Sequence, residues 1–304
     1  MFEIEAAGSP ARSAASTMEG TVPITPGRLT RPSGPSLEVL IRHPERPSGL
    51  PPVLLVHGAF TGAWCWEETW MHALGETGRL VAAVSLRGHG TSEGRAALPW
   101  TGLHDFAEDL ALAIRAMPEP PVLVAHSIGG LLAQHLLTSI LAGHLALRGL
   151  VLVGSLPPEG LALAGPQLGL SLWLEALAGQ FGRTPDFDHH DAMFGTGIEP
   201  AVAAAYAARI GTDTFLTLCL GSFTSLAQAY IPLPVLPAWG IGLPTLVLHG
   251  SDDRLVDSAA AARTALYHGA DLDSIAGAGH CPMLGPRASV GAQVLNRWLD
   301  AQGL

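Results

Sequence analysis

The sequence predicts an α/β fold: a mostly parallel central sheet flanked by helices, with a helical cap inserted between its two parts. Short apolar runs bounded by Pro and Gly, as buried strands are, alternate with stretches whose apolar residues recur at helical spacing. This alternation stops between residues 156 and 242 and then resumes. The chain has 304 residues, of which 48% are hydrophobic, and it can therefore bury a large core.

Residues 1–36 contain few large apolar side chains and are rich in Ala, Ser, Thr, Gly and Pro. Such a composition cannot offset the entropy lost on ordering, so we expect a flexible N-terminal leader. The first part of the core is expected over residues 37–155, as a parallel sheet covered on both faces that binds ligands at the carboxyl ends of its strands. The expected strands are LEVLIRH, PPVLLVHG, LVAAVSL, PVLVAHS and LRGLVLVGS, and the expected helices cover residues 66–74, 102–117 and 129–141.

Residues 156–242 show no clear strand. Helical patterns occur instead over residues 168–178, 200–210 and about 214–229, so we expect a helical cap over the strand ends. The second part of the core is expected over residues 243–304. It contains the strand TLVLHG, a helix over residues 259–267, the short strand DLDSIAG and a final helix over residues 290–299.

Charge and cysteine content exclude several classes of protein. The formal net charge is −10 and no basic run occurs, which argues against a nucleic-acid or anionic-membrane partner. Cys65, Cys219 and Cys281 are widely spaced and odd in number, so neither a disulfide framework nor a zinc site of paired cysteines is expected. The N-terminus has acidic residues where a signal peptide is basic, and no apolar run is long enough for a membrane span. We expect a cytoplasmic protein that needs no cofactor or metal, and the sequence gives no expectation for its oligomeric state.

The stretch PPVLVAHSIGGLLAQHLL consists of an apolar strand, a tight turn that carries Ser127, and a helical pattern. A serine hydroxyl acts as a nucleophile only with a general base, an anion-stabilising pocket and a backbone that presents it. The small residues Ala125, Gly129 and Gly130 let strand and helix approach closely around a sharply turned serine. By itself, the pattern A-x-S-x-G also fits an ordinary strand-to-helix junction with a capping serine.

Two later strand ends supply the partners that such a nucleophile needs. Asp252 and Asp253 follow the strand TLVLHG, and His280 follows the next short strand in a glycine-rich turn. The chain order Ser, Asp, His is the one that this topology uses for a catalytic triad. We therefore expect Ser127, one of the two aspartates and His280 to meet at the carboxyl edge of the sheet.

With these residues, the chain resembles the α/β-hydrolase superfamily from about residue 37 to residue 304. His280 in G-H-x-P-M is similar to the catalytic histidine of that family, the general base for Ser127 and then the acid for the leaving group. The resemblance implies Asp253 as the triad acid, with Asp252 in reserve. The familiar spacing G-x-x-D-x-[LIV]-V is matched by Gly250, Asp253, Leu255 and Val256.

The resemblance also implies an oxyanion hole made of two backbone N–H groups. One belongs to Ile128, directly after the nucleophile. The other lies in the turn after VLLVHG, at Ala59, with Phe60 as the alternative. We expect the Phe60 side chain to form part of the wall of the acyl pocket instead. Aromatic side chains of the cap form either the cap's own core or the rest of the pocket wall: Trp173, Phe194 and Phe223.

The stretch HGAFTGAWCW resembles the plant methylesterases and hydroxynitrile lyases, which carry H-G-A and G-A-W-C-W there. The lyases of that group use a lysine near the histidine, and this chain has no lysine, so an esterase is favoured. We predict a serine hydrolase that cleaves a small-molecule carboxylic ester with an apolar moiety through an acyl-enzyme on Ser127. Alternatives on the same fold are a C–C bond hydrolase, a lactonase, a thioesterase or acyltransferase, and a haloperoxidase-like enzyme. A different class is a non-catalytic ligand receptor.

Three residues near the expected site have simpler interpretations. His57 and His126 are expected to orient loops by hydrogen bonds rather than to react. Cys281, next to His280, is expected to be a buried and unreactive thiol.

Overall fold

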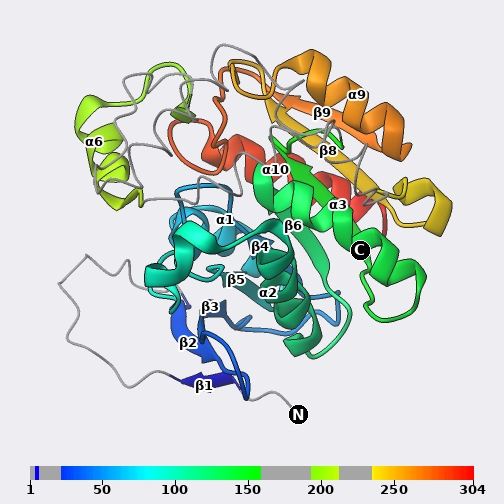
Figure 1. Ribbon diagram of the computed structural model, residues 1–304. Helices are drawn as coiled ribbons and strands as arrows, with labels where there is room; N and C mark the ends of the chain where they lie inside the picture. Colours follow the sequence, from blue (N-terminus) through cyan, green and yellow to red (C-terminus); the bar gives the residue numbers. More distant parts are fainter. Residues whose placement is uncertain (1–3, 7–21, 159–192, 212–234) are drawn as a thin grey trace.

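The computed structural model describes residues 4–6, 22–158, 193–211 and 235–304 (Figure 1). Within these ranges, nine strands form one sheet in the order β1-β2-β3-β5-β4-β6-β7-β8-β9. The six neighbouring strands β5-β4-β6-β7-β8-β9 are parallel to one another. The strands β1, β2 and β3 pair antiparallel with their neighbours, and β3 pairs in this way with β5. The strands are β1 (Ile4–Ala6), β2 (Thr25–Leu29), β3 (Leu37–Arg42), β4 (Val53–Val56), β5 (Val81–Val84), β6 (Val122–His126), β7 (Gly149–Val153), β8 (Thr245–Gly250) and β9 (Asp271–Ile275).

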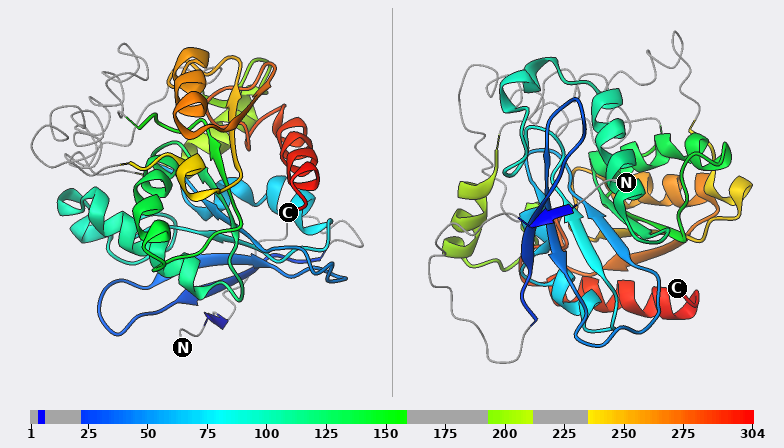
Figure 2. Two further views of the ribbon diagram at one scale, coloured as in Figure 1. Left: turned by 90° about the vertical axis from the view of Figure 1, so that its right-hand side faces the viewer. Right: turned by 90° about the horizontal axis from the view of Figure 1, so that it is seen from below.

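The central strands are short apolar runs because both faces of the sheet are covered. Every residue of β4, β6, β7 and β8 is buried. Figure 2 (right) shows the covering layers: α2, α3 and α9 lie on one face, and α1 and α10 lie on the other. Their bounds are α1 (Trp70–Gly75), α2 (Leu103–Ala116), α3 (Ile128–Leu141), α9 (Ser258–His268) and α10 (Ala288–Ala301). The expected α/β fold with a mostly parallel sheet is confirmed.

Short 3₁₀ helices complete the core at Ala63–Trp66, Arg95–Trp100 and Ala238–Ile241. The helix expected over residues 66–74 is divided between the 3₁₀ helix Ala63–Trp66 and α1.

The region predicted to be a cap contributes one described α-helix, α6 (Pro200–Arg209), close to its expected bounds. This helix is anchored to the core, because the Tyr206 hydroxyl donates a hydrogen bond of 2.6 Å to a Glu68 carboxylate oxygen. The helices expected over residues 168–178 and 214–229 lie outside the described residues. That residues 156–242 act as a cap stays a prediction.

The expectation of a flexible leader over residues 1–36 is wrong for the segment that contains β2. This strand pairs with β3 along its whole length, from Thr25 opposite Ile41 to Leu29 opposite Leu37. Leu29 is fully buried. The leader composition is poor in apolar residues on average, but one well-placed apolar side chain and ladders of backbone hydrogen bonds to β1 and β3 suffice to hold this strand in the sheet. Residues 7–21 of the expected leader lie outside the described residues.

Candidate active site

Ser127 occupies a sharp turn between β6 and α3. Its backbone has φ 53° and ψ −118°, a region that L-residues rarely adopt. The turn closes only because the neighbouring residues are small: a Cβ added at Gly129 would meet the backbone carbonyl of His57, and one added at Gly130 would meet the Ser155 side chain. The close strand-to-helix approach expected from the sequence is therefore present, with Ala125 in place of the more usual glycine.

His280 joins Ser127 to Asp253 in one hydrogen-bonded chain. The imidazole Nε2 lies 2.9 Å from Ser127 Oγ, and Nδ1 lies 2.9 Å from Asp253 Oδ2. The other carboxylate oxygen of Asp253 accepts backbone N–H bonds from Leu255 at 2.8 Å and Val256 at 2.9 Å. All three side chains are buried. The structure thus brings together the three side chains that were predicted to meet.

Asp252, the reserve acid, faces away from this chain of hydrogen bonds. Its carboxylate accepts a hydrogen bond of 2.7 Å from Thr196 Oγ1 and one of 2.9 Å from Ser251 Oγ. The hydroxyl of Thr196, and then that of Ser251, holds the pKa of Asp252 below its usual value because both stabilise the charged form. Asp252 therefore fixes the loop after β8, and Asp253 is the aspartate that reaches the histidine.

His126 holds the backbone of His280 in place. Its Nε2–H donates a 2.9 Å hydrogen bond to the His280 carbonyl, and the two ring centroids lie 4.8 Å apart. Burial, and then the neighbouring His280, lowers the pKa of His126 well below its usual value, so this ring is neutral. The prediction that His126 orients a loop by hydrogen bonding is confirmed. The sequence does not indicate that the His280 carbonyl is the group to which His126 donates, because the two residues are far apart in the chain.

Gly154, which follows β7, also lies against this part of the site and was not predicted. A Cβ there would lie 3.1 Å from the His280 carbonyl oxygen and 3.4 Å from Asp253 Oδ2, and the residue has φ +47°. The sequence signal was a glycine directly after the apolar run of β7.

The turn after β4 packs directly against Ser127. A Cβ added at Gly58 would lie 2.8 Å from the Cβ of Ser127. His57 fixes this turn, because its Nε2 accepts the Leu86 N–H at 3.0 Å while Nδ1–H donates to the Gly58 carbonyl at 2.6 Å. The predicted orienting role of His57 is confirmed. The next residues of the turn, Ala59 and Phe60, are the predicted oxyanion donors on this side.

The remaining predicted residues have different environments. Phe60 is buried and lines a small pocket of about 220 Å³. Phe194 is 1% exposed and packs against Tyr206 of α6, with ring centroids 5.4 Å apart. Trp173 and Phe223 lie outside the described residues. The Cys281 thiol is buried, and burial followed by the nearby Asp253 raises its pKa, which makes it unreactive as expected.

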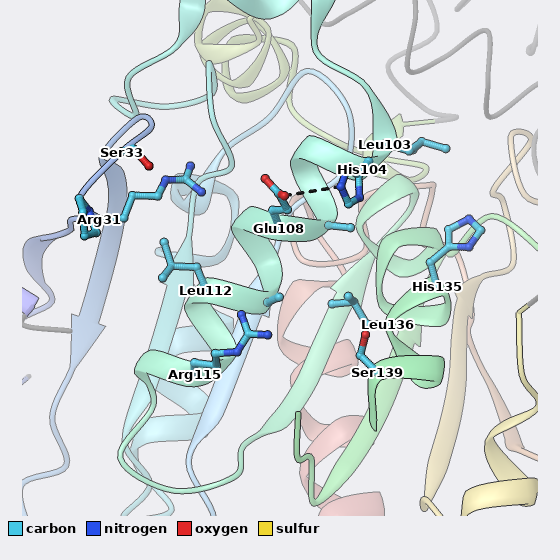
Figure 3. A pocket seen from close by; sticks show the side chains of 13 residues that line it. Arg31, Ser33, Leu103, His104, Glu108, Leu112, Arg115, His135, Leu136 and Ser139 are labelled. Atoms are coloured by element: carbon cyan, nitrogen blue, oxygen red, sulfur yellow. Dashed lines mark ion pairs between the residues drawn. The ribbon is translucent and has the colours of Figure 1, made fainter. Parts of the chain in front are cut away.

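A larger cavity, of about 750 Å³, lies elsewhere, between α2, α3 and residues 31–33 (Figure 3). No triad residue lines it. In the ranges that the structure covers, no three His, Cys, Asp or Glu side chains are grouped so that they could hold a metal ion. None of the helices in these same ranges has the length and apolar character needed to cross a membrane.

A serine on a sharp strand-to-helix turn, followed along the chain by an aspartate and a histidine at later strand ends, is the arrangement found in α/β hydrolases. The comparison with known families agrees: a sequence model of the alpha/beta hydrolase family matches residues 53–292. The chain belongs to this family.

Individual relatives resemble parts of the chain or its fold. Over 81 residues the chain is 38% identical to Methylesterase 3 of Arabidopsis thaliana. These residues make up 26% of this chain and correspond to 30% of that protein. A solved thermophilic esterase superposes with a TM-score of 0.66 at 21% identity, covering 92% of this chain and 99% of the esterase. A solved haloalkane dehalogenase loop variant from Bradyrhizobium elkanii superposes with a TM-score of 0.70 at 20% identity. This match covers 92% of this chain and 98% of the dehalogenase. The two structural matches show the shared fold.

Proposed function

We propose that the protein is a serine hydrolase that cleaves small carboxylic esters with an apolar moiety. The observation that carries this proposal is the continuous hydrogen-bonded chain from Ser127 Oγ through His280 to Asp253. Its support from similarity is the local identity to a protein named as a methylesterase. We further propose that the enzyme acts in the cytoplasm.

In the proposed reaction, Ser127 Oγ attacks the ester carbonyl while His280 Nε2 takes the hydroxyl proton. The tetrahedral intermediate collapses when the same nitrogen returns that proton to the departing alcohol, which leaves an acyl group on Ser127. A water molecule then attacks the acyl-enzyme while His280 Nε2 takes its proton, and the same nitrogen returns that proton to Ser127 Oγ as the acid leaves. Asp253, which two backbone N–H groups hold in place, stabilises the imidazolium without taking its proton.

The negative oxygen of each tetrahedral intermediate needs donors on the side opposite the histidine. We assign them to the backbone N–H groups of Ile128 and Ala59. Ile128 is the first residue of α3, where N–H groups have no partner within the helix, and Ala59 belongs to the turn that touches Ser127. No cofactor or metal takes part in this scheme.

The test is hydrolysis of p-nitrophenyl esters of graded chain length. Ser127→Ala and His280→Ala should lower kcat/KM by at least about 1,000-fold, because either change removes a group that acts in the transition state. Asp253→Asn should lower kcat/KM by about as much, since the wrong imidazole tautomer of His280 is then favoured. Asp252→Asn is the matched control and should keep most of the activity. Hydrolysis that survives Ser127→Ala would refute the assignment, and tight binding of esters without turnover would favour a receptor.

A further inference from the structure

A pocket of about 220 Å³ lies beside the turn that follows β4. Two of its described lining residues, Arg95 and Arg209, are cationic, and none of these lining residues is acidic. This is unusual in a chain with a formal charge of −10. The described lining residues are Phe60, Thr61, Trp64, Gly88, His89, Gly90, Arg95, Arg209 and Gly211.

The pocket lies over strand ends that neighbour the one leading to the proposed nucleophile. Phe60 and Thr61 follow β4, and Gly88 and Gly90 follow β5, so the pocket lies over the carboxyl ends of these two strands. β4 pairs directly with β6, the strand that ends at Ser127. The pocket therefore lies over strand ends beside the one that leads to Ser127, and Ser127 itself is not among its lining residues.

The wall formed by the turn after β5 is fixed by buried charges. Arg87 forms two hydrogen bonds of 2.8 Å to the carboxylate of Asp109, whose side chain has no exposed surface. The two glycines of this turn, Gly88 and Gly90, have φ values of +76° and +52°, and a Cβ there would meet the Leu98 side chain and the Glu38 carboxylate respectively. The wall is therefore rigid and closely packed.

The two arginines approach the pocket from different elements. Arg95 begins a 3₁₀ helix, and its Nη2 would lie 3.6 Å from a Cβ added at Gly211. Arg209 ends α6 and lies over the Trp64 ring, with its guanidinium carbon 4.5 Å from the centroid. Its ion pair with Glu67 is long, at 3.6 Å, and 42% of each side chain is exposed, so it competes weakly with a ligand.

We propose that this pocket binds a carboxylate carried by the substrate, so that the preferred substrates are monoesters of dicarboxylic acids. Planar guanidinium groups match a carboxylate in a bidentate manner, and the volume suits a small anionic group with a short apolar linker. The inference rests on the proposed function, because it names the substrate class of the same site.

The larger cavity of Figure 3 gives no comparable preference. Its arginine from the β2–β3 loop, Arg31, is paired with Asp109 at 2.5 Å, and Glu108 and His104 pair with each other on its rim at 3.5 Å. Positive and negative side chains are mixed there, and no feature identifies an occupant. Arg115 lines this cavity and serves below as a control.

The experiment compares two esters that differ only in charge: mono-p-nitrophenyl adipate and its methyl-capped diester. We expect the wild type to have the higher kcat/KM for the charged ester, and this ratio to fall with added salt. Arg95→Gln and Arg209→Gln should each lower the ratio by about tenfold, as expected for the loss of one charged hydrogen-bonding partner. Arg115→Gln, an exposed arginine outside the pocket, should leave the ratio unchanged.

The outcomes separate the two proposals. If neither ester is hydrolysed, the proposed function fails; carboxylate binding is then decided by titrating Ser127→Ala with monomethyl adipate, with and without Arg95→Gln. If both esters are hydrolysed but the ratio does not change in either arginine variant, the carboxylate pocket is wrong and the esterase remains. If the ratio is low in the wild type and rises in Glu67→Gln, the Arg209 guanidinium serves that acidic neighbour instead of a ligand, which also overturns the inference.

Discussion

Ser127 holds an unfavourable backbone conformation, and the hydrogen bonds around it compensate. Its N–H donates to the Val153 carbonyl at 3.0 Å, and its own carbonyl accepts N–H groups from Gly130 at 3.0 Å and Leu131 at 3.3 Å. A strained residue of this kind costs about 1–3 kcal/mol and persists only where its surroundings determine it. The turn is thus fixed from β7 and from α3 at once, which keeps the hydroxyl directed at His280.

His126 gives a prediction at the same scale. His126→Phe keeps a ring but removes the donor to the His280 carbonyl, which leaves that buried carbonyl unpaired at a cost of about 1–3 kcal/mol. We expect kcat on a p-nitrophenyl ester to fall about tenfold with little change in KM, because His126 acts through the position of the His280 backbone. His126→Gln places an amide donor near the position of Nε2 and should restore part of kcat. An equal loss in both variants would contradict a positioning role and indicate a packing role.

The candidate site could be predicted from the sequence to the extent that it depends on strand ends. Ser127, Asp253 and His280 each follow an apolar run, and a parallel sheet brings such ends together. The contacts of His126 and Gly154 could not be predicted, because each joins residues that are distant in the chain and meet only after the sheet is assembled. The arginines of the pocket were missed for the same reason, since they lie on two separate helices.

At the scale of elements, β2 shows why an average over composition can fail to detect a strand. Its sequence TPGRL contains Pro and Gly and lacks the alternation of a half-buried strand. The strand is held instead by its neighbours: it pairs with β3, and Arg28 Nη1 donates to the Thr91 carbonyl at 2.6 Å. The inner strands were predictable because their apolar runs are continuous and each one is bounded by turn residues.

A truncation tests the contribution of β2 to stability. A variant that begins at residue 22 keeps β2, and one that begins at residue 37 loses it together with the buried side chains of Ile24 and Leu29. Each such side chain contributes about 1.5–3 kcal/mol, so the shorter variant should lose about 3–6 kcal/mol of unfolding free energy relative to the longer one. Urea unfolding followed by circular dichroism measures the difference. Equal stability of the two variants would show that the strand contributes nothing to the core.

At the scale of the whole molecule, helices on one face are joined to each other through buried polar groups. The amide of Gln134 in α3 donates to Ser155 Oγ at 3.0 Å and to the Leu156 carbonyl at 2.8 Å. Its oxygen accepts from His268 Nε2 in α9 at 3.0 Å, and His268 Nδ1 in turn accepts the Ala238 N–H at 3.2 Å. The imidazole must be neutral to fill both roles, so α3, α9 and the end of β7 are held together only by the unprotonated form.

This requirement makes stability depend on pH, and the direction follows from the pKa. Burial lowers the pKa of His268 from 6.5 to about 4 in the folded protein. The unfolded chain therefore binds the proton first as the pH falls, so the stabilisation is complete above about pH 6.5 and is lost progressively toward pH 4. We expect the free energy of unfolding to fall by about 2 kcal/mol between pH 7.5 and pH 5 through this residue alone. Urea titrations at the two pH values should show a smaller decrease for His268→Gln, whereas His104→Gln, at a side chain that is 88% exposed, should behave as the wild type. If His268→Gln loses as much stability on acidification as the wild type, His268 is not the group that links protonation to unfolding.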